Sequence, residues 1–379
     1  MFTRSRLVLA RKSRGLSLVR LAELAEITTR SLSSYENGKS KPTEESLGRL
    51  ADMLGFPVSF FMASDLDELP AEAVSFRAVS KLGAAKRDTA LSLGRLAIEL
   101  HEWIDARFRL PSPDVPTLTQ FSAVYAAQQS TAASHGRSGP ELAAEMVRAR
   151  WGLGNAPISN VLHLLEAHGV RVCSLAERCA DVDAFSLWWQ AAPYVFFNTR
   201  KSAERGRFDA AHELGHLVLH GEAQKLHGKE AEREADRFAA AFLMPHDSVI
   251  ARIPPNPSPQ AVVQAKKYWK VAAMALAHRL YEVGLSTEWH YRTTCIELAR
   301  RGYRSAEPSG ASRETSQVLN KVFRAMRSEG VSPANIAGDL HLDPNDLIDL
   351  IFGLVVTSIS GNGEGAGHRP QRPQLNLVR

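Results

Sequence analysis

The sequence predicts a mainly α-helical protein with one small antiparallel sheet, an α+β fold. Three features predict it: short helical blocks fill the first 63 residues, β-branched and aromatic runs are confined to positions 170–199, and helical periodicity returns after them. At 379 residues the chain exceeds what one hydrophobic core organises, so several domains are expected. We place their boundaries at residues 1–63, 64–139, 140–304, 305–357 and 358–379.

The composition, 44% hydrophobic and 23% charged, is that of an ordinary globular protein. No apolar run is long enough to cross a bilayer, and basic residues interrupt the first fifteen positions, where a secretory signal would be apolar. We therefore expect a cytoplasmic protein that does not contact membranes. Cys173, Cys179 and Cys295 form neither a CxxC pair nor an even set, which suits a reducing compartment and buried thiols.

The N-terminal block reads as four short helices separated by turn residues. Gly15 ends the first helix, and Ser17 caps the second. Thr28 caps the third, and Gly38 supplies a left-handed stop. A fourth helix, residues 44–54, closes the bundle.

Two short helices joined by a tight turn can enter a major groove of DNA with the second helix foremost. The side chains expected to reach base edges are Thr29, Arg30, Ser33 and Ser34. The side chains expected to contact phosphates are Asn37, Lys39 and Lys41. The plain alternative is a small helical bundle used for dimerisation or another protein contact.

Charge favours DNA over that alternative, because residues 1–63 hold ten basic side chains against six acids. The basic residues are Arg4, Arg6, Arg11, Lys12, Arg14, Arg20, Arg30, Lys39, Lys41 and Arg49. The acids are Glu23, Glu26, Glu36, Glu44, Glu45 and Asp52.

The order of helix breaks, the "ENGKSKP" turn and the "LGRLADMLG" helix resemble the Xre (Cro/cI-like) helix-turn-helix domains over residues 3–62. The resemblance implies binding to double-stranded operator DNA, and we expect a homodimer on a two-fold operator. Two positions depart from the family pattern. Leu18 stands where a glutamine often contacts phosphate, and Glu26 replaces the usual turn glycine.

Residues 64–139 read as a helical connector, with one strong helix over 91–108 and a low-complexity stretch before Pro140. Two amphipathic helices follow, each closed by glycine. The runs "VRVCSL", "AFSLWW" and "YVFFNT" then predict the strands of the small sheet.

The segment "RFDAAHELGHLVLH", residues 207–220, carries the pattern HExxH. On a helix, positions i and i+4 project side by side, so His212 and His216 can both offer an imidazole nitrogen to one ion. Glu213 is the next residue after His212, about 100° further around the helix, and can reach a water on the open side of that ion.

A catalytic zinc site needs a third protein ligand, and the helix "EAEREADRFAAAF" supplies one. We assign Glu232 as that ligand and Asp236 as the carboxylate that orients a histidine through its other ring nitrogen. Glu230 is a weaker substitute for Glu232. Glu234 projects away from Asp236 and is expected to face solvent.

A third histidine ligand is the competing scheme, but His220 follows His212 by only eight residues and stays within the same helix. His220 with Gly221 reads better as a helix C-terminus. His278 and Tyr281 are possible oxyanion donors, although packing or surface roles suit them better.

These residues predict one zinc ion per chain, with Glu213 as the base that activates water for attack on a peptide bond. From about Val170 to Leu285 the chain resembles the ImmA/IrrE family of gluzincin-like metallopeptidases, on the two metal segments and the following "YWKVAAMALAHRLYEVGL". The resemblance implies His212, His216 and Glu232 as zinc ligands. It also implies a protein substrate, with an Xre-type repressor as one candidate.

Residues 305–357 predict three short helices with Ser332 and Asp343 as caps, in a helix-turn-helix rhythm. Asp339, Asp343, Asp346 and Asp349 would repel phosphates, so we expect this domain to contact protein. Residues 358–379 are rich in glycine and proline and are expected to be a disordered tail.

The leading hypothesis is a DNA-binding transcriptional regulator that carries a zinc metallo-endopeptidase domain. The alternative is a regulator whose metalloprotease-like domain senses a signal or binds a partner without cleaving. A third reading is a dedicated immunity-type peptidase whose helix-turn-helix domain only places it beside a repressor substrate.

Overall fold

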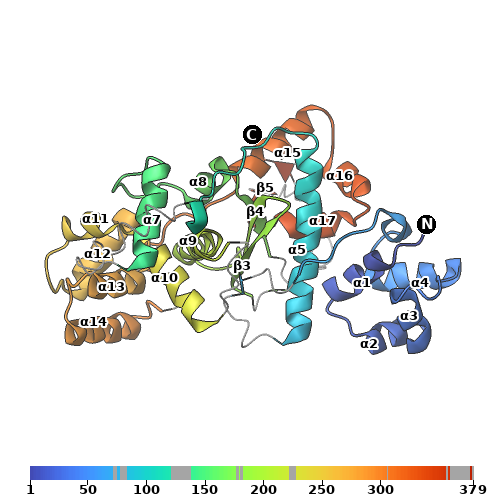
Figure 1. Ribbon diagram of the computed structural model, residues 1–379, viewed down its shortest axis with the longest axis horizontal. Helices are drawn as coiled ribbons and strands as arrows, with labels where there is room; N and C mark the ends of the chain where they lie inside the picture. The colour runs from blue at the N-terminus through green and yellow to red at the C-terminus, as the bar shows by residue number, and fades with distance from the viewer. Residues whose placement is uncertain are drawn as a thin grey trace, which may run out of the picture.

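The computed structural model describes residues 1–70, 83–120, 138–175, 182–221, 228–304 and 306–355, together with Cys179 and the backbone of three short strands. The chain is mainly helical with one small sheet, which confirms the predicted fold class. Figure 1 shows an elongated molecule, with the N-terminal bundle at one end, helices α11 to α14 at the other, and the sheet between them. No helix in the described part of the chain is both long and apolar enough to span a membrane.

The N-terminal bundle, residues 1–63, has the four predicted helices and a short 3₁₀ turn. They are α1 (Arg4–Ser13), α2 (Leu18–Leu24), α3 (Thr29–Glu36), α4 (Glu44–Leu54) and η1 (Val58–Met62). Ser17 and Thr28 cap α2 and α3 as expected, and Gly38 has φ +70°. Glu26 adopts φ 52° in the turn between those helices, so the left-handed turn is kept without a glycine.

The sheet has four strands in the order β1-β3-β4-β2. Their bounds are β1 (Ser75–Phe76), β2 (Arg171–Ser174), β3 (Ala184–Trp189) and β4 (Ala192–Phe197). The β3–β4 pair is antiparallel as predicted, and β1, which lies in the expected connector, also pairs antiparallel with β3, but β2 pairs parallel with β4. The sheet is therefore mixed and not wholly antiparallel, because the chain crosses over between β2 and β3.

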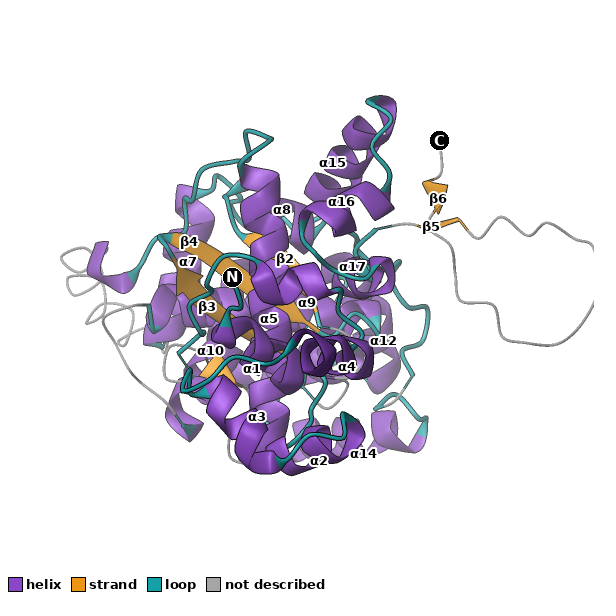
Figure 2. Ribbon diagram, turned by 90° about the vertical axis from the view of Figure 1, so that its right-hand side faces the viewer, coloured by secondary structure: helices purple, strands orange, loops and turns teal. Residues whose placement is uncertain are grey.

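Alternate residues of β3 face two different helices. Phe185 lies against Gly94 of α5 (Ala84–Asp105), and the next residue, Ser186, bonds to Glu213 of α9 (Ala203–Leu219). The sheet is thus covered by α5 on one face and α9 on the other, as Figures 1 and 2 show. Residues 91–98 of α5 are all buried, which is typical of a helix at the centre of a core.

Helix α5 begins seven residues before the predicted start at Leu91, because residues 84–90 are alanine, threonine or charged and contain no large apolar side chain that would reveal a helical period. The low-complexity stretch of the expected connector falls mainly on residues 121–137, outside the described residues.

The remaining helices complete the central and C-terminal parts. Those of the central part are α7 (Gly139–Arg150), α8 (Val161–Ala167), α10 (Lys229–Leu243), α11 (His246–Ile250), α12 (Pro259–Trp269), α13 (Ala273–Glu282) and α14 (Glu288–Arg300). Cys173 and Cys179 are buried as expected, whereas Cys295 on α14 is half-buried.

The C-terminal helices, residues 316–355, contain three elements as predicted: α15 (Gln317–Ser328), α16 (Pro333–Asp339) and α17 (Pro344–Ile351). Ser332 and Asp343 cap α16 and α17. Two short strands, β5 (Thr357–Ser358) and β6 (Asn376–Leu377), pair antiparallel, and the rest of the expected tail lies outside the described residues.

Acidic side chains of the C-terminal helices contact other parts of the same chain. Asp346 accepts two hydrogen bonds of 2.7 Å from Arg14 of α1. Asp339 accepts from the indole of Trp103, near the end of α5, and from Arg107, just beyond it. Two of the four acids expected to disfavour DNA are thus used for contact with protein within the molecule.

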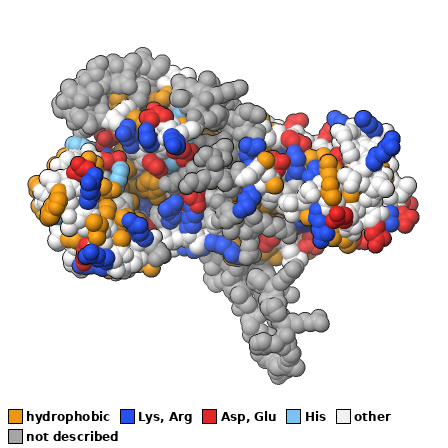
Figure 3. Space-filling view, turned by 90° about the horizontal axis from the view of Figure 1, so that it is seen from below, with side chains coloured by type: hydrophobic (Ala, Val, Ile, Leu, Met, Phe, Trp, Pro, Cys, Tyr) orange, Lys and Arg blue, Asp and Glu red, His pale blue; other side chains and the backbone are white. Residues whose placement is uncertain are grey.

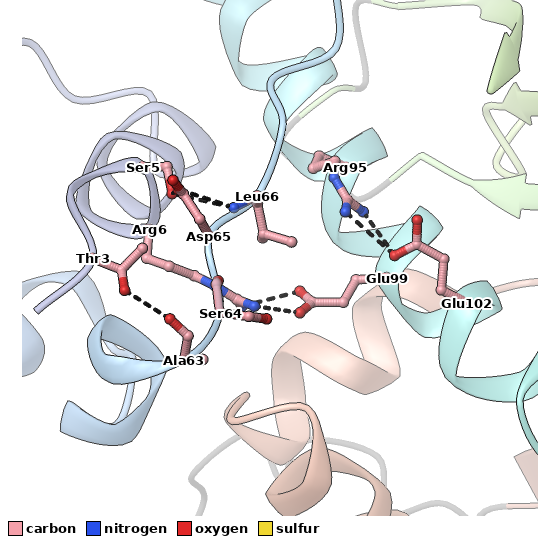
Figure 4. A network of polar contacts seen from close by, with 10 residues as sticks. All are labelled: Thr3, Ser5, Arg6, Ala63, Ser64, Asp65, Leu66, Arg95, Glu99 and Glu102. Atoms are coloured by element: carbon pink, nitrogen blue, oxygen red, sulfur yellow. Dashed lines mark hydrogen bonds and ion pairs between the residues drawn. The ribbon is translucent and has the colours of Figure 1, made fainter. Parts of the chain in front are cut away.

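A second arginine of α1 joins the N-terminal bundle to α5 (Figure 4). Arg6 donates two hydrogen bonds to Glu99, at 2.6 and 3.2 Å, and its Nε donates to the carbonyl of Ser64 at 2.9 Å. The guanidinium also lies over the ring of Phe60, and the side chain is 1% exposed. Arg6 and Arg14 therefore attach the bundle to α5 and α17 at two points.

We predict that Arg6→Met lowers the free energy of unfolding by about 2–3 kcal/mol, because it leaves Glu99 facing an apolar contact without its ionic partner. Arg20→Met is the matched control, since Arg20 pairs with Glu23 on an exposed face. That variant is expected to change stability by less than about 0.5 kcal/mol. Urea denaturation of the full chain checks both, and equal losses would contradict the anchoring role of Arg6.

Candidate functional site

Helix α9 places both histidines of the HExxH segment on its buried side. Ser202 caps the helix by accepting a hydrogen bond from the backbone N–H of Arg205. Gly215 lies where α9 crosses α10, and a methyl group added there would come within 3.1 Å of the Phe238 ring. A side chain at this position would press on the Phe238 ring, so the glycine favours the close crossing.

Three side chains converge between these two helices. His212 Nε2 lies 3.5 Å from Glu232 Oε2, and His216 Nε2 lies 3.4 Å from Glu232 Oε1. The two imidazole nitrogens are 3.0 Å apart. One ligand atom from each residue lies within 4.8 Å of the others, so the three form a candidate metal-binding group.

The protonation states of this group suit a divalent ion. Burial lowers the pKa of His216 to about 4, and its hydrogen bond with Glu232 only partly offsets that effect. Burial works to raise the pKa of Glu232, but hydrogen bonds with His212 and His216 outweigh it and lower that pKa to about 2. At neutral pH His216 is therefore neutral and Glu232 ionised, as metal ligation requires.

Glu213 lies beside this group in a fully buried position. Ser186 of β3 donates a hydrogen bond of 2.7 Å to its Oε2, while Oε1 has no hydrogen-bond partner among the described residues. Burial raises the pKa of Glu213 to about 8, although His212 and the bond from Ser186 oppose the rise. A nearby dication favours the ionised carboxylate and would bring this pKa back toward neutrality.

The N-terminal bundle carries a second candidate site, defined by its charges. Of its ten basic side chains, six form ion pairs and Arg4 donates to the carbonyl of Asn37. Arg30, Lys39 and Lys41 are exposed and make no hydrogen bond or ion pair within the described chain. The three unpaired cations are thus the three that the sequence places beside DNA, on α3 and the turn after it.

Of the polar residues expected to contact DNA on the same surface, some already make hydrogen bonds within the bundle. Thr29 is exposed at the start of α3. Asn37 donates to the carbonyl of Ser33 at 2.8 Å, and Ser34 shares a hydrogen bond with Ser40. Figure 3 shows the N-terminal bundle on the right, with Lys and Arg side chains, in blue, at its surface among acidic side chains, in red.

Comparison with known protein families gives two matches. Residues 7–61 match the model described as helix-turn-helix, and residues 165–281 match the peptidase M78 model, described as the IrrE N-terminal-like domain. The chain carries a helix-turn-helix domain and an M78 peptidase domain. The second match spans α9 and α10, including the whole candidate metal group. No curated protein matches the chain.

A second layer of residues surrounds the metal group of the M78 domain. Asp236 Oδ1 lies 2.9 Å from Nδ1 of His212, the position that its expected orienting role requires. His220 is the C-cap of α9, as expected, yet its Nδ1 also lies 2.9 Å from His216 Nδ1 and its Nε2 lies 2.9 Å from Glu234. The expectation that Glu234 only faces solvent is therefore wrong.

The hydrogen bond of Glu234 with His220 was not predicted, because the direction of Glu234 was inferred only relative to Asp236 on the same helix. The crossing of α10 over the end of α9 brings His220 into its reach, and no spacing within either helix encodes that crossing. A histidine at i+4 from a metal-binding histidine was the available signal, since such residues adjoin on a helix.

The other residues considered for the M78 domain make contacts outside the candidate metal group, although, besides a hydrogen bond with Glu282, the charge of Asp236 helps raise the pKa of His278. Glu230 pairs with Arg233 on an exposed face of α10. His278 pairs with Glu282, and Tyr281 stacks on Tyr291, consistent with packing and surface roles.

We predict that Gly215→Val lowers the free energy of unfolding by about 1–3 kcal/mol, because the added side chain overlaps Phe238. It also separates α9 from α10, so zinc affinity is expected to fall. Gly206→Ala on the same helix is the control, since nothing lies within 4 Å of a methyl group there. Thermal unfolding and zinc titration of both variants check this, and normal zinc affinity in Gly215→Val would contradict it.

Proposed function

We propose that this chain is a DNA-binding transcriptional regulator whose M78 domain is a zinc-dependent endopeptidase acting on a partner protein. The convergence of two buried histidines, His212 and His216, with the half-buried Glu232 is the main support for the peptidase. The unpaired cations on and after α3 are the main support for DNA binding.

The donor set fits zinc. Two neutral imidazoles and one ionised carboxylate are the three protein ligands found in a class of catalytic zinc sites, where the fourth place belongs to water. When bound, zinc supplies Lewis-acid polarisation of the substrate carbonyl and makes water more acidic. Asp236 accepts a hydrogen bond from His212 Nδ1 and so leaves Nε2 as the ligating atom.

Glu213 is the proposed proton carrier of the reaction. A carboxyl group whose pKa lies near neutrality can take a proton from the attacking water and give it to the leaving amine. Ser186 holds one carboxylate oxygen, and the other, Oε1, is without a partner in the described chain and is available for that proton. The buried position excludes bulk water from the exchange.

The helix-turn-helix domain would place this peptidase on operator DNA. Thr29, Arg30, Ser33 and Ser34 are the proposed base contacts, and Asn37, Lys39 and Lys41 the proposed phosphate contacts. We further propose a homodimer on a two-fold operator. An Xre-type repressor is the candidate substrate.

We predict that Glu213→Gln lowers the rate of peptide cleavage by about 10²–10⁴-fold while zinc content stays at wild-type level, because the amide cannot carry a proton. Zinc-loaded wild-type and variant proteins would be incubated with Xre-type repressors encoded nearby, and fragments identified by mass spectrometry. DNA affinity should be equal in the two proteins.

Absence of any fragment from the zinc-loaded wild-type protein, together with normal gene control by Glu213→Gln in cells, would favour the non-cleaving sensor. A wild-type protein that binds no zinc would remove the basis for a peptidase and leave the DNA-binding function standing.

We predict that Lys39→Ala and Lys41→Ala each weaken binding to a labelled duplex of mixed sequence and lower the slope of log affinity against log salt by about 1, because each removes one phosphate contact. Lys267→Ala on α12 removes an exposed cation outside the helix-turn-helix domain and is the control. Equal slopes for all three variants would contradict the assigned surface.

A further inference from the structure

Helices α9 and α10 each present three titratable side chains to the other. His212, His216 and His220 project from α9 and its C-terminal residue, and Glu232, Asp236 and Glu234 project from α10. Glu232 faces the two candidate ligand imidazoles, and Asp236 contacts His212. His220 and Glu234 are the remaining pair, and neither has a part in the function proposed above.

We propose that His220 and Glu234 are positioning residues of the metal centre, which hold His216 in its ligating orientation through a relay of two hydrogen bonds. This inference rests on the proposed zinc site. The relay runs from His216 Nδ1 to His220 Nδ1, at 2.9 Å, and from His220 Nε2 to Glu234 Oε2, at 2.9 Å.

For a neutral His220 beside an ionised Glu234, the direction of both hydrogen bonds follows from which groups can donate. An ionised carboxylate can only accept, so the proton on His220 lies on Nε2 and is donated to Glu234. His220 Nδ1 then carries the lone pair and accepts from the N–H at His216 Nδ1. His216 Nε2 would then carry no proton once a metal ion replaces the hydrogen bond that it makes with Glu232, 3.4 Å away, in the metal-free chain.

The burial of His220 excludes a surface role, because its side chain is only 5% exposed. Its contacts also exclude a role as third ligand in place of Glu232. Both of its ring nitrogens are already bonded, and the side chains whose ligand atoms converge are those of His212, His216 and Glu232.

The two ligand histidines are thus held in different ways. His212 bonds directly to Asp236, whose side chain is 47% exposed. His216 bonds to a buried imidazole, and the carboxylate stands one group further away. Partners that orient ligand histidines contribute about 10–100-fold to metal affinity, so losing either end of the relay should weaken binding by that factor.

The test uses the full chain with Glu234→Gln and His220→Phe as probes of the two relay members. Glu234→Gln removes the charge, and His220→Phe keeps a ring but removes both nitrogens. Glu230→Gln is the matched control, because it makes the same change on an exposed face of the same helix. Zinc dissociation constants would be measured by competition with a chelator, and cobalt-substituted proteins compared by their visible spectra.

Both relay variants are expected to bind zinc about 10–100-fold more weakly than wild type, with an altered cobalt spectrum, while Glu230→Gln matches wild type. His220→Gln should restore part of the affinity lost in His220→Phe, since its amide can both accept and donate. Melting temperatures of the metal-free proteins identify a variant that fails to fold, in which case Glu234→Gln decides.

Wild-type zinc affinity and cobalt spectra in both relay variants would overturn the relay alone. A wild-type chain that binds neither zinc nor cobalt would overturn the proposed metal site, and the relay with it. The two failures are therefore distinguishable.

Discussion

The close crossing of α9 and α10 is the constraint on which the metal centre depends. Gly215 and Phe238 meet at the crossing, where the absence of a side chain on one helix accommodates a ring on the other. Small residues continue along α10, with alanines at 239, 240 and 241 all buried. This packing holds the helices near enough for carboxylates of one to reach imidazoles of the other, so the ligands belong to a rigid core instead of a loop.

Much of this centre follows from the sequence because it depends on local periodicity. The HExxH spacing places His212 and His216 side by side, and the ExxxD spacing places Glu232 and Asp236 on one edge of the next helix. The contact of His220 with Glu234 depends on how far one helix slides along the other. Periodicity within each helix carries no information about that distance, so this part of the centre required the structure.

The sheet likewise has features that local sequence predicts, the positions of its strands, and features that it does not, the pairing of those strands. Strands β2, β3 and β4 were predicted from residue type, and their positions agree with the structure, whereas the two-residue β1 was not predicted. The turn between β3 and β4 is formed by Gln190 and Ala191, both with positive φ, and so lacks the glycine or asparagine that usually marks a hairpin. The parallel pairing of β2 with β4 depends on the path of the chain between strands, which residue types do not determine.

The attachment of the N-terminal bundle to α5 and α17 neutralises part of the positive charge of the bundle. Arg6 and Arg14 face Glu99 and Asp346. A fragment cut after residue 63 would leave both guanidinium groups without their carboxylates and would gain two cations unrelated to base recognition. The excess of positive charge on such a fragment would no longer be reduced by the two carboxylates, so α5 and α17 moderate the charge of the bundle in the intact chain.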